Sequence, residues 1–142
     1  MGQLLKKHIK NEKGLTLIEL LAVIVILGII AAIAIPSIAN IIHKSREDAV
    51  KADAIQIINS AKMYIAGEGS KDTITKTDLD SYLNDVSTFS AFTVNVTTNA
   101  TSKDTVISLT GDGAKGNVSI HFADATITDI NNAEKGSTTI GD

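Results

Sequence analysis

Residues 20–42 read LLAVIVILGIIAAIAIPSIANII and contain no charged side chain. As a helix, these 23 residues would be about 35 Å long, enough to cross a hydrocarbon core of about 30 Å. Their long aliphatic side chains together favour membrane insertion by about 5 kcal/mol. Four lysines and one glutamate precede the segment within residues 1–14. This basic end should stay in the cytoplasm, which predicts a transmembrane helix with the rest of the chain outside.

Glu19 lies at the edge of this apolar run. A carboxylate inside a bilayer costs a few kcal/mol, and less near the interface. Two interpretations follow. Either Glu19 reaches the cytoplasmic headgroups and has no further role, or it meets a positive partner in an assembly, because a buried carboxylate is tolerated when it is paired.

Residues 13–19, KGLTLIE, followed by the apolar helix resemble the class III signal of type IV pilins and pseudopilins. The resemblance implies that a prepilin peptidase cuts after Gly14 and removes the leader, residues 1–14. It also implies that Leu15 becomes an N-methylated amino terminus and that Glu19 guides filament assembly. The family most often has phenylalanine where this chain has Leu15.

The charges of these residues are consistent with the resemblance. Cleavage would create an α-amino group at Leu15, one helical turn from Glu19. Glu19 of an incoming subunit could then be buried against the Leu15 ammonium of a neighbour, which neutralises both groups and sets the packing register.

Two rival signals remain for the amino terminus. Residues 32–34 and 37–39 have the small-x-small pattern of an ordinary secretory cleavage site, and an uncleaved signal anchor would need no cleavage site. The mature chain would begin at Leu15 in a pilin-like protein, at Ile35 or Asn40 after secretory cleavage, and at Met1 in an anchor.

Gly28 and Pro36 fall where many members of the resembled family have a glycine and a proline. Proline removes one helical hydrogen bond and clashes with the preceding turn, so the helix should kink or loosen there. Either the bilayer simply tolerates this proline, or the stretch between Gly28 and Pro36 melts during assembly.

The second half of the expected helix covers residues 43–69 and is amphipathic. Apolar side chains recur at helical spacing and should pack on a sheet, and Gly67 and Gly69 should end the helix. The residues of this stripe are Val50, Ala54, Ile57, Ile58, Ala61, Tyr64 and Ile65.

Residues 70–142 should form a globular β-sheet domain. Alternating apolar residues predict three strands and a weaker fourth, with a short helix or turn before them and a loop or irregular edge after them. In chain order, these are the turn at 77–83, the strands at 92–96, 106–109 and 118–122, the weaker strand at 125–130, and the tail at 131–142. The predicted fold class is therefore α+β and type IV pilin-like: a long amino-terminal helix, transmembrane in residues 15–42, packed on a small antiparallel sheet of three or four strands.

The chain shows no pattern typical of catalysis, and we expect no enzyme activity, cofactor or metal. It has no cysteine, its three histidines are scattered, and no serine lies in a nucleophile motif. Gly111, Gly113 and Gly116 have dinucleotide-loop spacing without a following helix, which favours a flexible hairpin loop. Residues 15–142 carry a net charge of −6, so direct nucleic-acid binding is not expected.

The resemblance implies a structural subunit of an extracellular type IV pilus, made as a single-pass cytoplasmic-membrane precursor with its amino terminus in the cytoplasm. The implied partners are identical subunits, the prepilin peptidase, an inner-membrane assembly platform with its ATPase, and the bilayer before assembly. The alternative is a pseudopilin of a secretion or competence DNA-uptake system. A membrane-anchored enzyme or receptor would explain neither Glu19 nor the long helix.

Overall fold

The computed structural model describes the backbone of residues 2–84 and 86–142, and the side chains of residues 2, 3, 16–84 and 86–142. Helix α1 spans Gly2–Glu68 and is followed by a mostly β region. The chain divides into two compact units, and the second is Ile42–Asp142. The first unit is the part of α1 that precedes Ile42, and each unit is described by itself.

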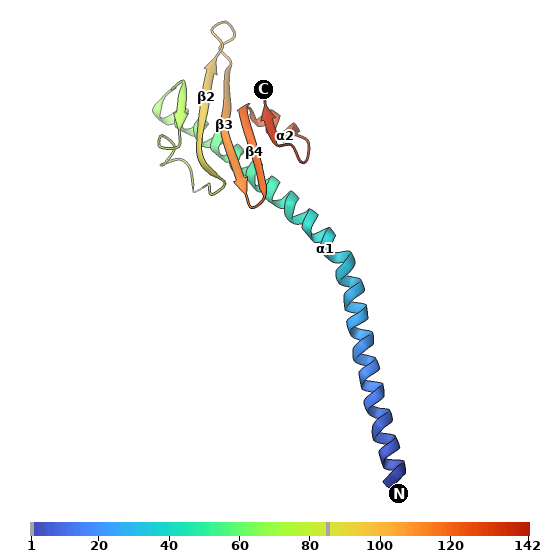
Figure 1. Ribbon diagram of the computed structural model, residues 1–142. Helices are drawn as coiled ribbons and strands as arrows, with labels where there is room; N and C mark the ends of the chain where they lie inside the picture. The colour runs from blue at the N-terminus through green and yellow to red at the C-terminus, as the bar shows by residue number, and fades with distance from the viewer. Residues whose placement is uncertain (1, 85) are drawn as a thin grey trace. The chain divides into compact units, whose positions relative to one another are not determined.

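The second unit contains a five-stranded sheet in the order β1-β2-β3-β4-β5. Strands β2, β3 and β4 lie side by side as its centre (Figure 1). The three hairpin-connected pairs are antiparallel, whereas β5 pairs with β4 in parallel. The strands are β1 (Thr73–Thr75), β2 (Phe89–Thr98), β3 (Thr105–Lys115), β4 (Val118–Ala125) and β5 (Thr139–Gly141), and a short helix, α2 (Ile127–Asn132), lies between β4 and β5.

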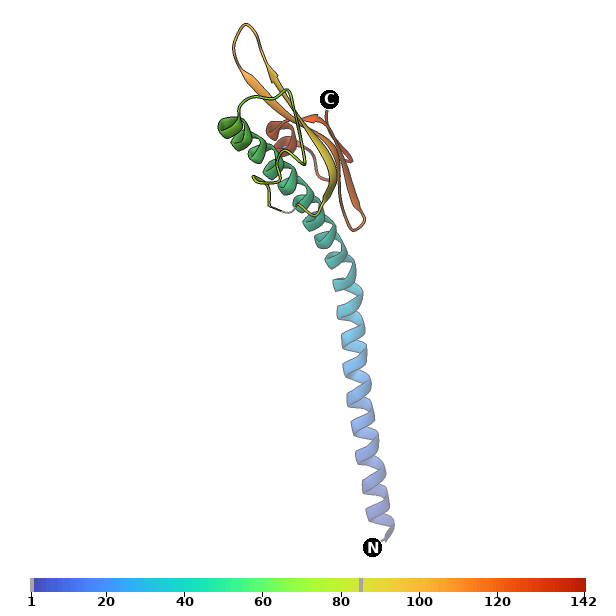
Figure 2. The ribbon, with the colours of Figure 1, turned by 90° about the vertical axis from the view of Figure 1, so that its left-hand side faces the viewer.

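The carboxyl-terminal part of α1 crosses one face of this sheet (Figure 2). Val50, Ala54, Ile57, Ile58 and Ala61 are fully buried, and Tyr64 and Ile65 pack on the same core from its edge. This confirms the helical stripe predicted from the spacing of apolar residues.

The sheet contributes aromatic side chains to that core. Phe89 lies 5.5 Å from Phe122 and 6.3 Å from Phe92 between ring centroids. All three phenylalanines of the chain are buried, each at 6% exposure or less. The core is therefore aliphatic on the helix side and partly aromatic on the sheet side.

The predicted α+β class, a long helix on a mainly antiparallel sheet, is confirmed. The three predicted strands lie within β2, β3 and β4, and residues 76–82 form the predicted turn, with Leu79 fully buried. Helix α1 ends as expected, because Gly69 has a φ of +101° and donates its amide to the Ile65 carbonyl at 3.1 Å.

The prediction of a weaker strand at residues 125–130 was wrong, because α2 occupies most of this stretch. Thr126 and Asp129 form a capping box: the Thr126 side chain accepts from the Asp129 amide, and the Asp129 carboxylate accepts from the Thr126 amide at 2.9 Å. Ile130, which lies on this short helix, is buried in the core. The spacing of apolar residues in this stretch is compatible with a strand, but the Thr126 cap starts a helix instead.

The predicted sheet of three or four strands was also too small. Strand β1 has three residues, too few for visible alternation. Strand β5 has three as well, and it lies in the tail at 131–142 expected to be a loop or irregular edge. Because β5 pairs in parallel, it reaches the edge of β4 only after α2 has carried the chain back.

The expected hairpin loop at residues 111–116 was wrong for most of its length. Gly111 and Gly113 belong to β3, and the turn itself is formed by Gly116 and Asn117. A Cβ at Gly113 would lie 2.5 Å from Val50 Cγ1, so glycine is needed for α1 to approach the sheet. Glycine is needed here because the backbone packs closely, and not because a loop has to be flexible.

Candidate functional site

The first candidate site is the apolar face of α1 over residues 17–42. Its large side chains are exposed, as illustrated by Leu17 at 67% and Ile33 at 69%. Among the described residues, α1 is the one helix long and apolar enough to cross a membrane by length and composition. An aliphatic surface of this extent needs lipid or partner helices around it.

Glu19 lies on α1 among these apolar side chains and is exposed. Between Lys13 and Lys44 it is the only charged side chain of the sequence. Within the described part of the chain, no side chain forms an ion pair with it. A carboxylate in this position has its partner outside the described part of the chain or in water.

The predicted cleavage and methylation residues, Gly14 and Leu15, lie outside the residues whose side chains are described. Their roles, and the Leu15–Glu19 pair between neighbouring subunits, therefore stay predictions.

The helix continues without interruption through Pro36. Ser37 Oγ donates to the Ile33 carbonyl at 3.2 Å, which adds a hydrogen bond beside the one that proline removes. A Cβ at Gly28 would meet nothing within 4 Å, so no contact inside the described chain requires glycine there. Melting of this stretch during assembly stays a prediction.

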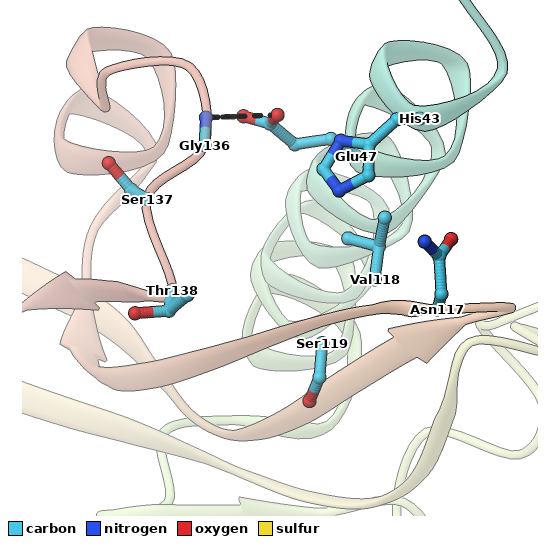
Figure 3. Close-up of a pocket in the computed structure, with 8 residues that line it drawn as sticks. All are labelled: His43, Glu47, Asn117, Val118, Ser119, Gly136, Ser137 and Thr138. Carbon is cyan, nitrogen blue, oxygen red and sulfur yellow. Dashed lines mark hydrogen bonds between the residues drawn. The ribbon is translucent and has the colours of Figure 1, made fainter. Parts of the chain in front are cut away.

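The second candidate site joins α1 to the carboxyl-terminal loop of the second unit. Glu47 is only 5% exposed in its side chain, and its carboxylate accepts from the Gly136 amide at 3.0 and 3.1 Å (Figure 3). Lys51 Nζ binds the same carboxylate at 2.8 Å and donates to the Ala133 carbonyl at 3.4 Å. We call these contacts the Glu47 latch.

The latch explains how the tail is held in a chain that has no disulfide. Burial by itself raises the pKa of Glu47, but the Lys51 ammonium and the Gly136 amide, with a smaller effect of His43, hold that pKa below its ordinary value of 4.5. The ionised carboxylate is therefore the form that the fold stabilises. Sequence reasoning missed this site, although Glu47 and Lys51 have the spacing of a helical ion pair.

A small pocket of about 120 Å³ lies beside the latch (Figure 3). His43 and Glu47 line it from α1, Asn117 from the turn before β4, Ser119 from β4 itself and Ser137 from the loop before β5. The described residues provide no group of three histidine, aspartate or glutamate side chains able to hold a metal. His43 and His121 are not brought together, since His121 pairs instead with Asp112 at 2.6 Å on the exposed side of the sheet.

The turn between β3 and β4 lies against α1 near the latch. Arg46 Nη1 donates to Asn117 Oδ1 at 2.6 Å. Gly116 has a φ of +63°, and a Cβ there would lie 2.8 Å from the Arg46 guanidinium carbon. The turn thus holds this guanidinium in place, a contact between residues 71 positions apart that no sequence pattern indicated.

The outer face of the sheet carries a hydrogen-bonded aspartate. Asp124 Oδ1 accepts from Asn95 Nδ2 at 2.5 Å and from the hydroxyls of Ser108 and Thr110 at 3.2 Å. These donors, Asn95 first, lower the pKa of Asp124 below its ordinary value. These hydrogen bonds lie at the bulge where β4 leaves its register with β3, so we interpret Asp124 as a structural group.

Comparison with known proteins identifies the amino-terminal segment. Residues 9–35 match the family described as the prokaryotic N-terminal methylation motif. A stretch of 62 residues is 40% identical to the type IV major fimbrial protein FimA of Dichelobacter nodosus. This stretch covers 43% of the chain and 40% of that relative, so the chain spans about two fifths of the length of the protein it matches. No solved structure matches significantly.

Proposed function

We propose that this chain, whose amino-terminal segment is similar to that of type IV pilins, is a structural subunit of an extracellular pilus with no enzymatic role of its own. The observation that carries the proposal is the α1 segment of residues 17–42, an exposed aliphatic helix with the single carboxylate Glu19. Lipid would cover this surface in the membrane precursor, and helices of other copies would cover it in the filament.

The proposed maturation begins with a precursor whose amino terminus is cytoplasmic. Prepilin peptidase cuts after Gly14, which removes four of the chain's lysines, and Leu15 is then N-methylated. Glu19 of each incoming copy meets the Leu15 ammonium of a neighbour. Pairing neutralises both charges in apolar surroundings, so the subunit is accepted in one register. An inner-membrane platform and its ATPase would supply the work of extraction.

A long pilus is favoured over the short fibre of a pseudopilin. The similarity to a major fimbrial protein supports this choice.

The decisive experiment replaces Glu19 by glutamine in the source organism and counts surface fibres by electron microscopy. We expect the variant to be exported and cleaved normally, with Leu15 as its first residue, but to form no filaments. Asp48→Asn is the matched control, because Asp48 is an exposed α1 carboxylate outside the apolar segment. Normal fibres from Glu19→Gln, or a mature chain beginning elsewhere than Leu15, would refute the mechanism. Long fibres that persist when the gene is deleted would favour the pseudopilin alternative.

A further inference from the structure

The second unit has a cationic end although the chain around it is acidic. Residues 15–142 have a net charge of −6, so as a whole they are repelled by an anionic surface. Lys44 and Lys115 are exposed, and Arg46 is half-buried against the turn that follows Lys115. We call Lys44, Arg46 and Lys115 the basic end.

Folding brings the basic end together from two elements. Lys44 and Arg46 lie on α1, whereas Lys115 is the last residue of β3 and precedes the turn at Gly116. That turn fixes the Arg46 guanidinium through the 2.6 Å hydrogen bond to Asn117. One bond leaves most of the five guanidinium N–H donors able to bind a phosphate.

Few negative charges oppose the basic end. Glu47 is neutralised by Lys51 at 2.8 Å and is turned toward the carboxyl-terminal loop. Asp48 is exposed and subtracts one charge, and Asp112 is engaged by His121. With Asp48 and Asp112 both counted, Lys44, Arg46 and Lys115 leave a net charge of +1 when the histidines are neutral.

The chain places this end beside the membrane. The apolar run ends at Ile42, and Lys44 and Arg46 follow within four residues, which is about 6 Å of helical rise. This distance is shorter than the Debye length of about 8 Å at physiological ionic strength. Any bilayer spanned by residues 20–42 therefore has its polar headgroups within electrostatic range of Lys44 and Arg46.

We propose that Lys44, Arg46 and Lys115 form a surface that docks on anionic phospholipid headgroups and holds the folded second unit against the membrane before assembly. The proposal rests on the membrane precursor of the proposed function. Docking would limit the rotation of the second unit about the membrane exit of α1. It would be released by extraction of the subunit, because the headgroups are then left behind.

The experiment uses the full chain reconstituted in vesicles, with a fluorophore on a single introduced cysteine. Ala114→Cys reports on the basic end, and Thr101→Cys, in the turn between β2 and β3, reports on a remote point. Paramagnetic headgroup lipids quench a fluorophore that lies near the surface. We expect the Ala114 probe to be quenched in vesicles containing phosphatidylglycerol, but much less in phosphatidylcholine vesicles or in 1 M salt, where the Debye length is about 3 Å.

Paired charge variants test which lysines are responsible. Each lysine near an anionic surface shifts binding about five-fold, so Lys44→Gln with Lys115→Gln should weaken docking about 30-fold. Lys62→Gln with Lys103→Gln removes the same charge from exposed positions outside the basic end and should leave docking unchanged. Arg46 is kept in both, because it contacts the turn at Gly116.

The outcomes separate this inference from the proposed function. If the chain floats with vesicles but the Ala114 probe is quenched equally in both lipids, or equally in both double variants, docking is refuted and the membrane precursor stands. If the chain does not float with vesicles at all, both are refuted. Quenching that needs anionic lipid and the two lysines supports the inference.

Discussion

Replacing Glu47 by alanine should release the carboxyl-terminal loop from α1. The carboxylate is 5% exposed and accepts from the Gly136 amide at 3.0 Å and from Lys51 at 2.8 Å. A hydrogen bond to a charged group contributes about 1.5–3 kcal/mol, and removing one partner of a buried ion pair costs about 3–5 kcal/mol. The Lys51 side chain is 14% exposed, so its ammonium can be partly hydrated once Glu47 is removed. The cost of the substitution should therefore fall in the lower of these two ranges. We expect a loss of about 2 kcal/mol.

Hydrogen exchange measures this loss at the place where it occurs. A cost of about 2 kcal/mol should speed exchange of the peptide covering residues 133–142 about 30-fold. Glu47→Gln keeps an acceptor for the Gly136 amide but loses the charge, so its effect should be smaller. Asp48→Asn is the control, because this exposed neighbour takes no part in the latch. Unchanged exchange of the tail in Glu47→Ala would refute the latch.

The same contacts predict a dependence on pH. The pKa of Glu47 lies below 4.5 in the folded chain, since Lys51, Gly136 and His43 outweigh the effect of burial. A lowered carboxyl pKa means that the stabilisation is fully present above about pH 4.5. It declines as the pH falls through the lowered pKa, where the folded carboxylate takes up its proton. Tail exchange should therefore accelerate in acid, and this acid step should disappear in Glu47→Gln.

Three further changes test other parts of the second unit. The Lys71 ammonium, together with the amide and hydroxyl of Thr75, lowers the pKa of Asp78 to about 2, so Lys71→Gln should raise that pKa part of the way toward its ordinary 3.8 in an NMR titration. Gly113→Ala would place a Cβ 2.5 Å from Val50 Cγ1, and such overpacking should cost about 1–3 kcal/mol in denaturant unfolding. Thr126→Ala removes the cap of α2 and should cost about 1 kcal/mol, seen as faster amide exchange within α2 alone.

Periodicity was sufficient for the long elements. The stripe from Val50 to Ile65 was predicted because helical spacing repeats over four turns, and the central strands were predicted because apolar residues alternate. Residues 125–130 were misread because so short a segment suits either period. The pair Thr126 and Asp129, a capping-box spacing, was the signal that could have decided it.

The contacts that define the second site could not be predicted in the same way. Glu47 and Gly136 are 89 positions apart, and Arg46 and Asn117 are 71 apart. Their meeting depends on the close approach of α1 at Gly113 and on the parallel pairing of β5, neither of which leaves a periodic pattern. The residues of the amino-terminal signal are contiguous in the sequence, so a prediction could be made for them, and their roles stay predictions.

The two units of this chain differ in how their apolar side chains are shielded from water. Residues 42–142 have their own buried core, so in the proposed function this unit would stay folded while its surroundings changed from membrane to filament. Over residues 16–41 the preceding helix has no buried side chain, and in the proposed function lipid or other helices would cover its exposed aliphatic side chains. Transfer between these environments replaces one apolar contact by another and changes the apolar free energy little. The proposed pair of Glu19 with the Leu15 ammonium would form in the filament only, so in the proposed function it would decide the direction of transfer.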